Sequence, residues 1–231
     1  LARRSLAAVR VAAERAAGKI VLTARPAELQ IEATNRCQGT CPTCARHYYD
    51  RAANPPGDLS PEILDRLAPL FATAERVLIG GYGEPLLSER TPEIVRRASA
   101  VGCDTAVISS AALMTEALAQ RLCTSGLTEI ILSVDGATEE TQLRRRGVSW
   151  LQLQATLQWL RRANPALHAT FNVTLQADNL DELPSLVLKA AENEVGHIAV
   201  HHQKIYTRTP AQSSVLSSAK HAQRVFDQGA L

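Results

Sequence analysis

Three cysteines lie close together in the segment CQGTCPTC, residues 37–44, with the spacing C-x3-C-x2-C. Thiolates are soft ligands that favour zinc or iron–sulfur clusters. A fully ligated four-iron cluster takes four protein thiolates. Three thiolates, from Cys37, Cys41 and Cys44, would leave one iron open to a substrate or cofactor, just as an open position separates catalytic from structural zinc sites.

The same segment also suits zinc. Cys37, Cys41, Cys44 and His47 form a Cys3His set at spacings that zinc sites tolerate. Judged by spacing alone, the iron–sulfur and zinc interpretations have equal weight. The rest of the chain must decide between them.

A glycine-rich turn, LIGGYGEPLL at residues 78–87, follows the second predicted strand. Gly80, Gly81 and Gly83 permit close approach of the backbone to a ligand. Glu84 offers a carboxylate to the ammonium group of a ligand. Such a turn is a weak signal alone, but one strand–helix unit after the cysteine segment it favours the cluster.

Short β-rich runs alternate with helical patterns along the chain. The six runs are residues 28–34, 76–81, 104–110, 129–135, 168–175 and 197–203. Strands that are each followed by a helix predict a parallel sheet of right-handed βαβ units. Six units are too few for a closed eight-stranded barrel, so we expect an α/β fold, a partial (βα)6 TIM-like barrel. Its active site belongs at the C-terminal ends of the strands, where the cysteines lie.

Helix boundaries are predicted from capping residues and glycines. The predicted N-caps are Ser60, Thr91, Thr115 and Asn179, the last paired with Glu182 in a capping box. The glycines predicted to end helices are Gly102, Gly126 and Gly196.

The composition of the 231-residue chain is that of an ordinary globular protein, 45% hydrophobic. A net charge of +2, from 25 basic and 23 acidic residues, argues against nucleic-acid binding as the main task. No apolar run is long enough for a membrane span, and the N-terminus lacks the apolar core of a secretory signal. Reduced cysteines used as ligands then predict a cytoplasmic protein.

Three parts are expected along the chain. Residues 1–26 form an N-terminal helical extension that packs through its Leu, Val and Ala side. Residues 27–206 form the core, and residues 207–231 form a C-terminal helical segment that could begin a further extension.

Four motifs together resemble the radical S-adenosylmethionine (SAM) enzymes. IEATNRCQGTCPTCAR, GGYGEPLL, VISSAALMT and ILSVDGATEET are similar to successive signatures of that family, within residues 28–206. The likeness is greatest to a subgroup with a CPxC-type cluster loop and a GxGEPLL motif, which often carries a C-terminal SPASM or twitch-type domain. No second cysteine cluster follows, so an auxiliary cluster is absent or lies beyond residue 231.

The resemblance implies a role for the residues of the first two motifs. Cys37, Cys41 and Cys44 would ligate a 4Fe-4S cluster, and the amino and carboxylate groups of SAM would chelate the fourth iron. The methionine ammonium would be held by the glycine-rich turn, through Gly80, Gly81, Gly83 and Glu84.

Further implied contacts lie at later strand ends. Ser109 and Ser110 would lie near the ribose or the methionine carboxylate, and Arg145 or Arg146 would meet that carboxylate. The other implied cavity positions are Ser133, Asp135, Asn172 and His201, the last with Gln203 near the adenine.

Two positions depart from the family pattern. Thr43 precedes the third cysteine, where many members have an aromatic residue, so we expect any adenine contact there to come from the backbone. Ala111 stands where relatives often have glycine, so we expect that turn to run differently.

Simpler structural roles are expected elsewhere. The run of arginines at 144–146 should be a mostly solvated helix face with one functional member. Of His201 and His202, one should face the pocket and one should pack, because neighbours in a strand point to opposite faces. Cys103 and Cys123 should be buried structural thiols.

The resemblance also implies a reaction. A reduced 4Fe-4S cluster would cleave SAM to a 5′-deoxyadenosyl radical, which abstracts a hydrogen atom from a peptide or small natural product. Dehydrogenation, epimerisation and bond formation all begin in this way. A flavodoxin- or ferredoxin-like donor would supply the electrons, although no sequence feature locates its docking site. The alternatives are a zinc-stabilised Cys3His binding module and a one-electron carrier without SAM chemistry.

Overall fold

The central element of the fold is a six-stranded parallel sheet in the order β1-β2-β3-β4-β5-β6. A computed structural model describes residues 2–21, 23, 26–48 and 50–203, with the backbone alone for residues 2–8. The strands are β1 (Glu28–Ile31), β2 (Arg76–Ile79), β3 (Asp104–Ser109), β4 (Glu129–Ser133), β5 (His168–Leu175) and β6 (His197–His202). This order confirms the predicted partial barrel.

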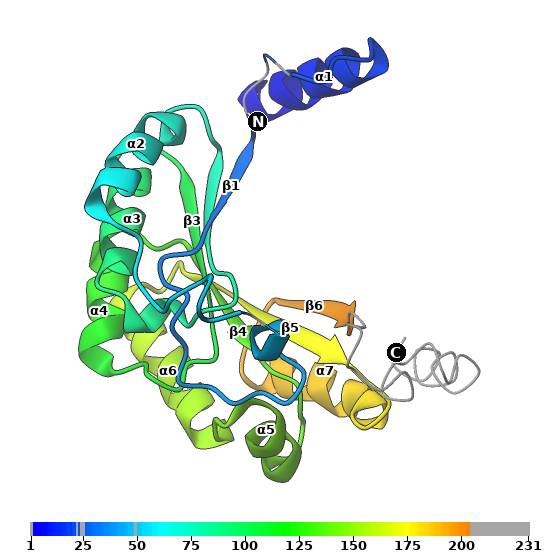
Figure 1. Cartoon of the computed structure of the whole chain (residues 1–231). Helices are drawn as coiled ribbons and strands as arrows, with labels where there is room; N and C mark the ends of the chain where they lie inside the picture. The colour runs from blue at the N-terminus through cyan, green and yellow to red at the C-terminus, as the bar shows by residue number, and fades with distance from the viewer. Residues whose placement is uncertain (1, 22, 24–25, 49, 204–231) are drawn as a thin grey trace.

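Helices between the strands cover the outer side of the curved sheet (Figure 1). The α-helices of the barrel are α2 (Pro61–Phe71), α3 (Arg90–Ser99), α4 (Glu116–Thr124), α5 (Glu139–Arg146), α6 (Trp150–Ala163) and α7 (Leu183–Glu192). Three short 3-10 helices lie in loops: η1 (Ala45–Tyr48), η2 (Pro85–Leu87) and η3 (Leu180–Glu182).

One hydrophobic cluster joins the sheet to these helices. Strand residues such as Val77, Ile130 and Phe171 are fully buried, as are Leu122 of α4 and Leu157 of α6. Burial of each such side chain contributes about 1.5–3 kcal/mol relative to exposure. The core therefore holds the strands rigid and leaves their C-terminal ends to carry the site.

Helix α1 (Ala2–Ala16) lies beyond the start of β1 and away from the sheet (Figure 1). Its described side chains, from residue 9 onward, are mostly exposed, so the expected packing through an apolar side is wrong for this part. Within the described residues, no helix is long and apolar enough to cross a membrane. Residues 207–231 lie outside the described residues, and the division at 26 and 206 stays a prediction.

Two of the predicted helix caps are confirmed. Ser60 Oγ accepts a hydrogen bond from the backbone N–H of Ile63 at the start of α2. Thr115 Oγ1 accepts one from the N–H of Leu118 at the start of α4. Each side chain satisfies a donor that the first helical turn leaves without a partner.

Two other predicted caps, Thr91 and Asn179, make no capping bond because their side chains have other partners. Thr91 lies inside α3, and its hydroxyl donates to the carbonyl of Pro85 at 2.6 Å. The Asn179 amide donates to the carbonyls of Asp135 (2.7 Å) and Thr174 (3.1 Å) and makes no capping bond.

Glycines end two helices as predicted. Gly102 follows α3 with φ +86° and Gly126 follows α4 with φ +100°. Glycine adopts such positive φ values easily, whereas residues with a Cβ disfavour them. The prediction for Gly196 is wrong, because the left-handed residue after α7 is Glu194, with φ +51°.

These two helix ends give a matched pair of substitutions. Gly102→Ala should cost about 1–2 kcal/mol of folding free energy from backbone strain alone, because nothing lies within 4 Å of its new Cβ. Gly126→Ala should cost at least about 1 kcal/mol more, since its Cβ would lie 2.1 Å from Ser99 Oγ. Urea denaturation measures both, and equal losses would contradict the clash.

Candidate active site

A cavity of about 710 Å³ lies at the C-terminal ends of the strands, where the fold predicts it. Each of the six strands, or the loop that follows it, contributes to the wall. Polar groups and thiols in the wall include Cys37, Cys41, Thr43, Cys44, Glu84, Ser109, Ser110, Ser133, Arg146, Asn172, Thr174, His201, His202 and Gln203. Most of the polar positions predicted from the strand ends are thus gathered around one space.

The three cysteines of the loop after β1 all line this cavity and are half-buried. The Sγ atoms of Cys37 and Cys41 lie 3.4 Å and 3.6 Å from the position that a Cβ on Gly39 would take. Burial raises the pKa of the Cys37 thiol, and Glu84 and Cys41 raise it further, against the lowering effects of the Gly39 N–H and Arg46. Three soft donors on one wall fit a cluster with an open position.

The Cys3His zinc set is not assembled. The His47 ring donates through Nε2 to the backbone carbonyl of Cys41 at 2.9 Å. Among the described residues, no three His, Cys, Asp or Glu side chains are grouped to hold one metal ion. A cluster does not require such a grouping, because each thiolate binds a different iron.

The glycine-rich turn after β2 lies directly against the segment that leads to the cysteines. A Cβ on Gly83 would lie 1.8 Å from the Thr34 carbonyl oxygen, so only glycine fits there. The Glu84 N–H donates to the Arg36 carbonyl at 2.8 Å. The two loops are therefore held together by backbone contact.

Glu32 supports the site from outside the cavity wall, and sequence reasoning missed it. It follows β1 directly, and its carboxylate accepts hydrogen bonds from the N–H groups of Tyr82 (2.6 Å) and Gly83 (2.9 Å). The only available signal was a charged residue immediately after a strand. The Glu32 carboxylate therefore connects the end of β1 to the glycine-rich turn after β2.

The Glu84 carboxylate is hydrogen-bonded to two serines at the end of β3. It accepts hydrogen bonds from Ser109 Oγ at 2.7 Å, Ser110 N–H at 3.0 Å and Ser110 Oγ at 2.8 Å. Only 3% of Glu84 is exposed. Glu84 borders the cavity but also holds the serines in place. Gly80 does not line the cavity, because it packs against Ile108 instead.

Ala111 keeps a left-handed turn after β3. Its φ is +66°, a conformation that glycine adopts freely and alanine disfavours. The Ala111 N–H donates to Ser109 Oγ at 2.9 Å, and its carbonyl accepts from Gln152 Nε2 at 3.0 Å. These bonds hold the turn despite the methyl group.

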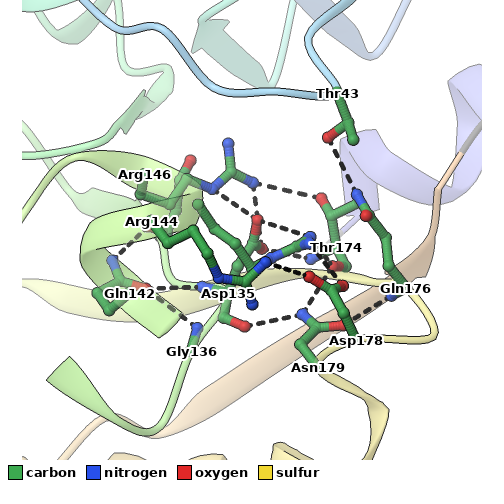
Figure 2. A network of polar contacts seen from close by, with 12 residues as sticks. Thr43, Asp135, Gly136, Gln142, Arg144, Arg146, Thr174, Gln176, Asp178 and Asn179 are labelled. Carbon is green, nitrogen blue, oxygen red and sulfur yellow. Dashed lines mark hydrogen bonds and ion pairs between the residues drawn. The ribbon is translucent and has the colours of Figure 1, made fainter. Parts of the chain in front are cut away.

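Asp135 and the arginines of α5 form a buried network beside the cavity (Figure 2). Asp135 Oδ1 accepts from the Thr174 N–H at 2.8 Å, and its Oδ2 pairs with Arg145 at 3.3 Å and Arg146 at 2.9 Å. Arg145 pairs also with Asp178 at 3.0 Å. Asp135 and Arg145 do not line the cavity, so of the two arginines predicted to meet the SAM carboxylate only Arg146 reaches its wall. The charges of Asp135 and Arg145 are paired with each other within the network.

Arg146 is the arginine that reaches the cavity wall. Burial lowers the pKa of its guanidinium, but Asp135 and Cys41 raise it more, so the net pKa is above its ordinary value. Arg145 is buried and only Arg144 is half exposed, so the prediction of a solvated face at 144–146 is wrong.

A hydrogen bond joins the cysteine loop to the loop after β5. Gln176 Nε2 donates to Thr43 Oγ1 at 3.0 Å (Figure 2). Gln176 is buried, and its backbone N–H donates to Asn179 Oδ1 at 2.7 Å. Sequence reasoning missed this contact, which fixes the residue before Cys44.

The last strand differs from expectation. His201 and His202 both line the cavity and both are exposed, so the prediction that one of them packs is wrong. The reason is position: β6 is at the edge of the sheet, where no further strand pairs with it among the described residues. Ser133 and Asn172 line the cavity as predicted.

The two remaining cysteines have structural surroundings. The Cys103 thiol is buried and donates to the carbonyl of Phe71 at 3.0 Å. Cys123 is half-buried and packs against the core. Burial raises the pKa of both thiols, which keeps them protonated and inert.

Comparison with known proteins decides the family. The family model described as the Radical SAM superfamily matches residues 31–190, more than half of the chain. This chain belongs to the radical SAM superfamily. The superfamily implies SAM and a 4Fe-4S cluster as cofactors, which agrees with the three thiols and removes the basis for the zinc interpretation.

Relatives with curated names are similar over most of this radical SAM chain. A PqqA peptide cyclase of Bradyrhizobium diazoefficiens is 27% identical over 185 residues, which are 78% of this chain and 47% of the relative. An AdoMet-dependent heme synthase of Methanosarcina barkeri is 26% identical over 188 residues, 79% of this chain and 51% of the relative. This chain therefore spans about half the length of those relatives.

Solved structures share the radical SAM fold. SuiB of Streptococcus suis bound to S-adenosylmethionine superposes with a TM-score of 0.69 at 16% identity, covering 95% of this chain and 50% of SuiB. The anSMEcpe structure with bound AdoMet and Cp18Cys peptide has a TM-score of 0.67 at 16% identity, covering 88% of this chain and 59% of that one. At this identity the likeness shows the fold.

Replacement of Gly83 tests the contact between the two loops. Gly83→Ala should lower the free energy of unfolding by about 1–3 kcal/mol, because its Cβ cannot fit beside the Thr34 carbonyl. Gly57→Ala is the control, because nothing lies within 4 Å of its Cβ, and should change stability by less than about 0.5 kcal/mol. Denaturant unfolding of both variants gives the comparison; a tolerated Gly83→Ala contradicts the contact.

Replacement of Asp135 tests the buried network. Asp135→Asn should cost about 3–5 kcal/mol of stability, because it leaves two guanidinium groups beside a neutral side chain. Asp178→Asn should cost at most about 1 kcal/mol, because Asp178 is half-exposed and Arg145 keeps its ion pair with Asp135. Thermal and urea unfolding measure both, and equal costs would show that Asp135 is not the centre of the network.

Proposed function

We propose that this chain binds a 4Fe-4S cluster and SAM and uses radical chemistry to modify a peptide. The observation that carries the proposal is the set of three thiols on one cavity wall, in a chain of the radical SAM superfamily. Cys37, Cys41 and Cys44 are the proposed cluster ligands. When bound, the cluster and SAM supply one-electron cleavage of SAM and abstraction of a hydrogen atom from the substrate.

The residues of the chain bind and orient under this proposal. The proposed partner of the SAM carboxylate is Arg146, and its position beside Cys41 and its ion pair with Asp135 support this role. The glycine-rich turn, fixed by Glu32 and ending at Glu84, lies at the same wall and supports its proposed contact with the methionine ammonium.

The polar groups on the other walls complete the proposed SAM site. The proposed contacts to the ribose, the adenine or the substrate come from Ser109, Ser110, Ser133, Asn172 and His201. A cavity of about 710 Å³ is within the range of roughly 300–1,000 Å³ typical of small-molecule sites.

A peptide is the proposed substrate class. Support comes from a relative named PqqA peptide cyclase and from a neighbour whose structure holds a peptide. A small natural product is the second candidate, because a relative named AdoMet-dependent heme synthase is similar at nearly the same identity. Low-potential electrons would come from a flavodoxin- or ferredoxin-like donor, and five free cysteines suit the proposed cytoplasmic location.

Removal of one proposed ligand tests the function. After anaerobic reconstitution, the wild type should hold about four iron and four sulfide per chain and release 5′-deoxyadenosine with SAM and dithionite. Cys41→Ala should lose most of the cluster and at least about 100-fold of the cleavage rate. Cys123→Ala, outside the cavity, is the control and should retain both.

The measurements are iron and sulfide analysis and mass spectrometry of 5′-deoxyadenosine. Cleavage that survives in Cys41→Ala would refute the assignment. A full, reducible cluster that never cleaves SAM would favour the one-electron carrier. Transfer of deuterium from a labelled peptide into 5′-deoxyadenosine would support the peptide class, whereas transfer only from small natural products would support the second candidate.

A further inference from the structure

A second hollow lies on another side of Cys37. It has a volume of about 140 Å³ and is lined by Arg36, Arg46, Arg51, two asparagines, a proline and Cys37. We call it the arginine hollow. Cys37 is the residue that lines both the arginine hollow and the main cavity. A partner bound in the arginine hollow would therefore touch the proposed cluster ligand without entering the SAM cavity.

The arginine hollow has a net positive charge. No acidic residue lines it. Arg36 is offset by Asp58, which its guanidinium contacts at 2.8 Å. Among the described residues, the structure gives neither Arg46 nor Arg51 a carboxylate partner within ion-pair distance. The nearby Asp50 carboxylate accepts from the backbone N–H of Ala52 at 2.8 Å and so turns toward its own loop. Two positive charges are left for a partner.

The hollow is also connected to the cysteine loop. Arg46 donates through Nη1 to the backbone carbonyl of Cys37 at 2.8 Å. Arg51 is exposed and Arg46 is half-buried, so an approaching surface can reach both, and Arg46 is in turn hydrogen-bonded to Cys37. An acidic group bound to both arginines would come close to Cys37.

We propose that the arginine hollow is the docking site of a small, acidic, one-electron carrier protein. The inference rests on the proposed function, which requires one electron for each cleavage of SAM. The carrier is oxidised by one electron, the cluster beside Cys37 is reduced by one, and no bond or proton changes hands. Opposite charge accelerates the encounter and orients the partner. The main cavity then remains free for SAM and substrate.

The direct test is binding of an acidic, FMN-containing flavodoxin to the anaerobic protein, followed by calorimetry. Wild-type binding should weaken at least about tenfold between low and high salt, because the contact is electrostatic. Arg51→Glu should weaken binding by about tenfold or more at low salt. The matched control is Arg96→Glu, the same charge reversal at an exposed position of helix α3, which should change the affinity by less than about twofold.

Arg46→Gln gives a second variant in case charge reversal disturbs the fold. Its flavodoxin affinity should fall by about threefold or more relative to wild-type protein of equal iron and sulfide content, a comparison needed because Arg46 also donates to the Cys37 carbonyl. Wild-type protein that does not bind flavodoxin would overturn the proposal. So would Arg51→Glu binding as tightly as the wild type, or Arg96→Glu weakening it equally.

A chemical reductant separates this proposal from the proposed function. With dithionite, which needs no docking site, Arg51→Glu should cleave SAM at the wild-type rate. With reduced flavodoxin, the same variant should be slower by about tenfold. If the wild type fails with dithionite, the proposed function fails, while the binding measurement still judges the arginine hollow.

Discussion

One half of the cavity rim depends on the hydrogen bond and the ion pairs of the buried Asp135 carboxylate. This carboxylate joins β4 to β5 through the Thr174 N–H and faces the guanidinium groups of Arg145 and Arg146. A buried ion pair adds little net stability, but loss of one partner is costly. The main effect of Asp135 is therefore geometric: Arg146 is kept at the cavity wall next to Cys41.

The other half of the rim is held by backbone contact. Gly83 lies against the Thr34 carbonyl, and the Glu84 N–H donates to the Arg36 carbonyl, immediately before the first cysteine. A side-chain hydrogen bond from Gln176 to Thr43 then connects the two halves. The cysteines are thus positioned from both sides by groups that do not themselves bind the proposed cluster.

Local signals predicted the fold well and the supporting contacts poorly. The strands were evident because apolar periodicity is local, and Ser60 caps its helix as its sequence indicates. Thr91 has the same local pattern, yet it lies inside helix α3 and its hydroxyl bonds to the carbonyl of Pro85 in the preceding 3-10 helix. The cysteine spacing identified the cavity, whereas Glu32 and Gln176 resemble ordinary polar residues after a strand. Their partners are distant in sequence and left no pattern.

The bond between Thr43 and Gln176 also bears on how the protein is made. The two residues are 133 positions apart, and a ribosome adding roughly 5–20 residues per second needs on the order of ten seconds to bridge that interval. During this time the cysteines have left the ribosome while the contact that fixes their loop does not yet exist. The thiols are exposed to oxidation in that interval, and cluster insertion into an ordered loop must follow synthesis of β5.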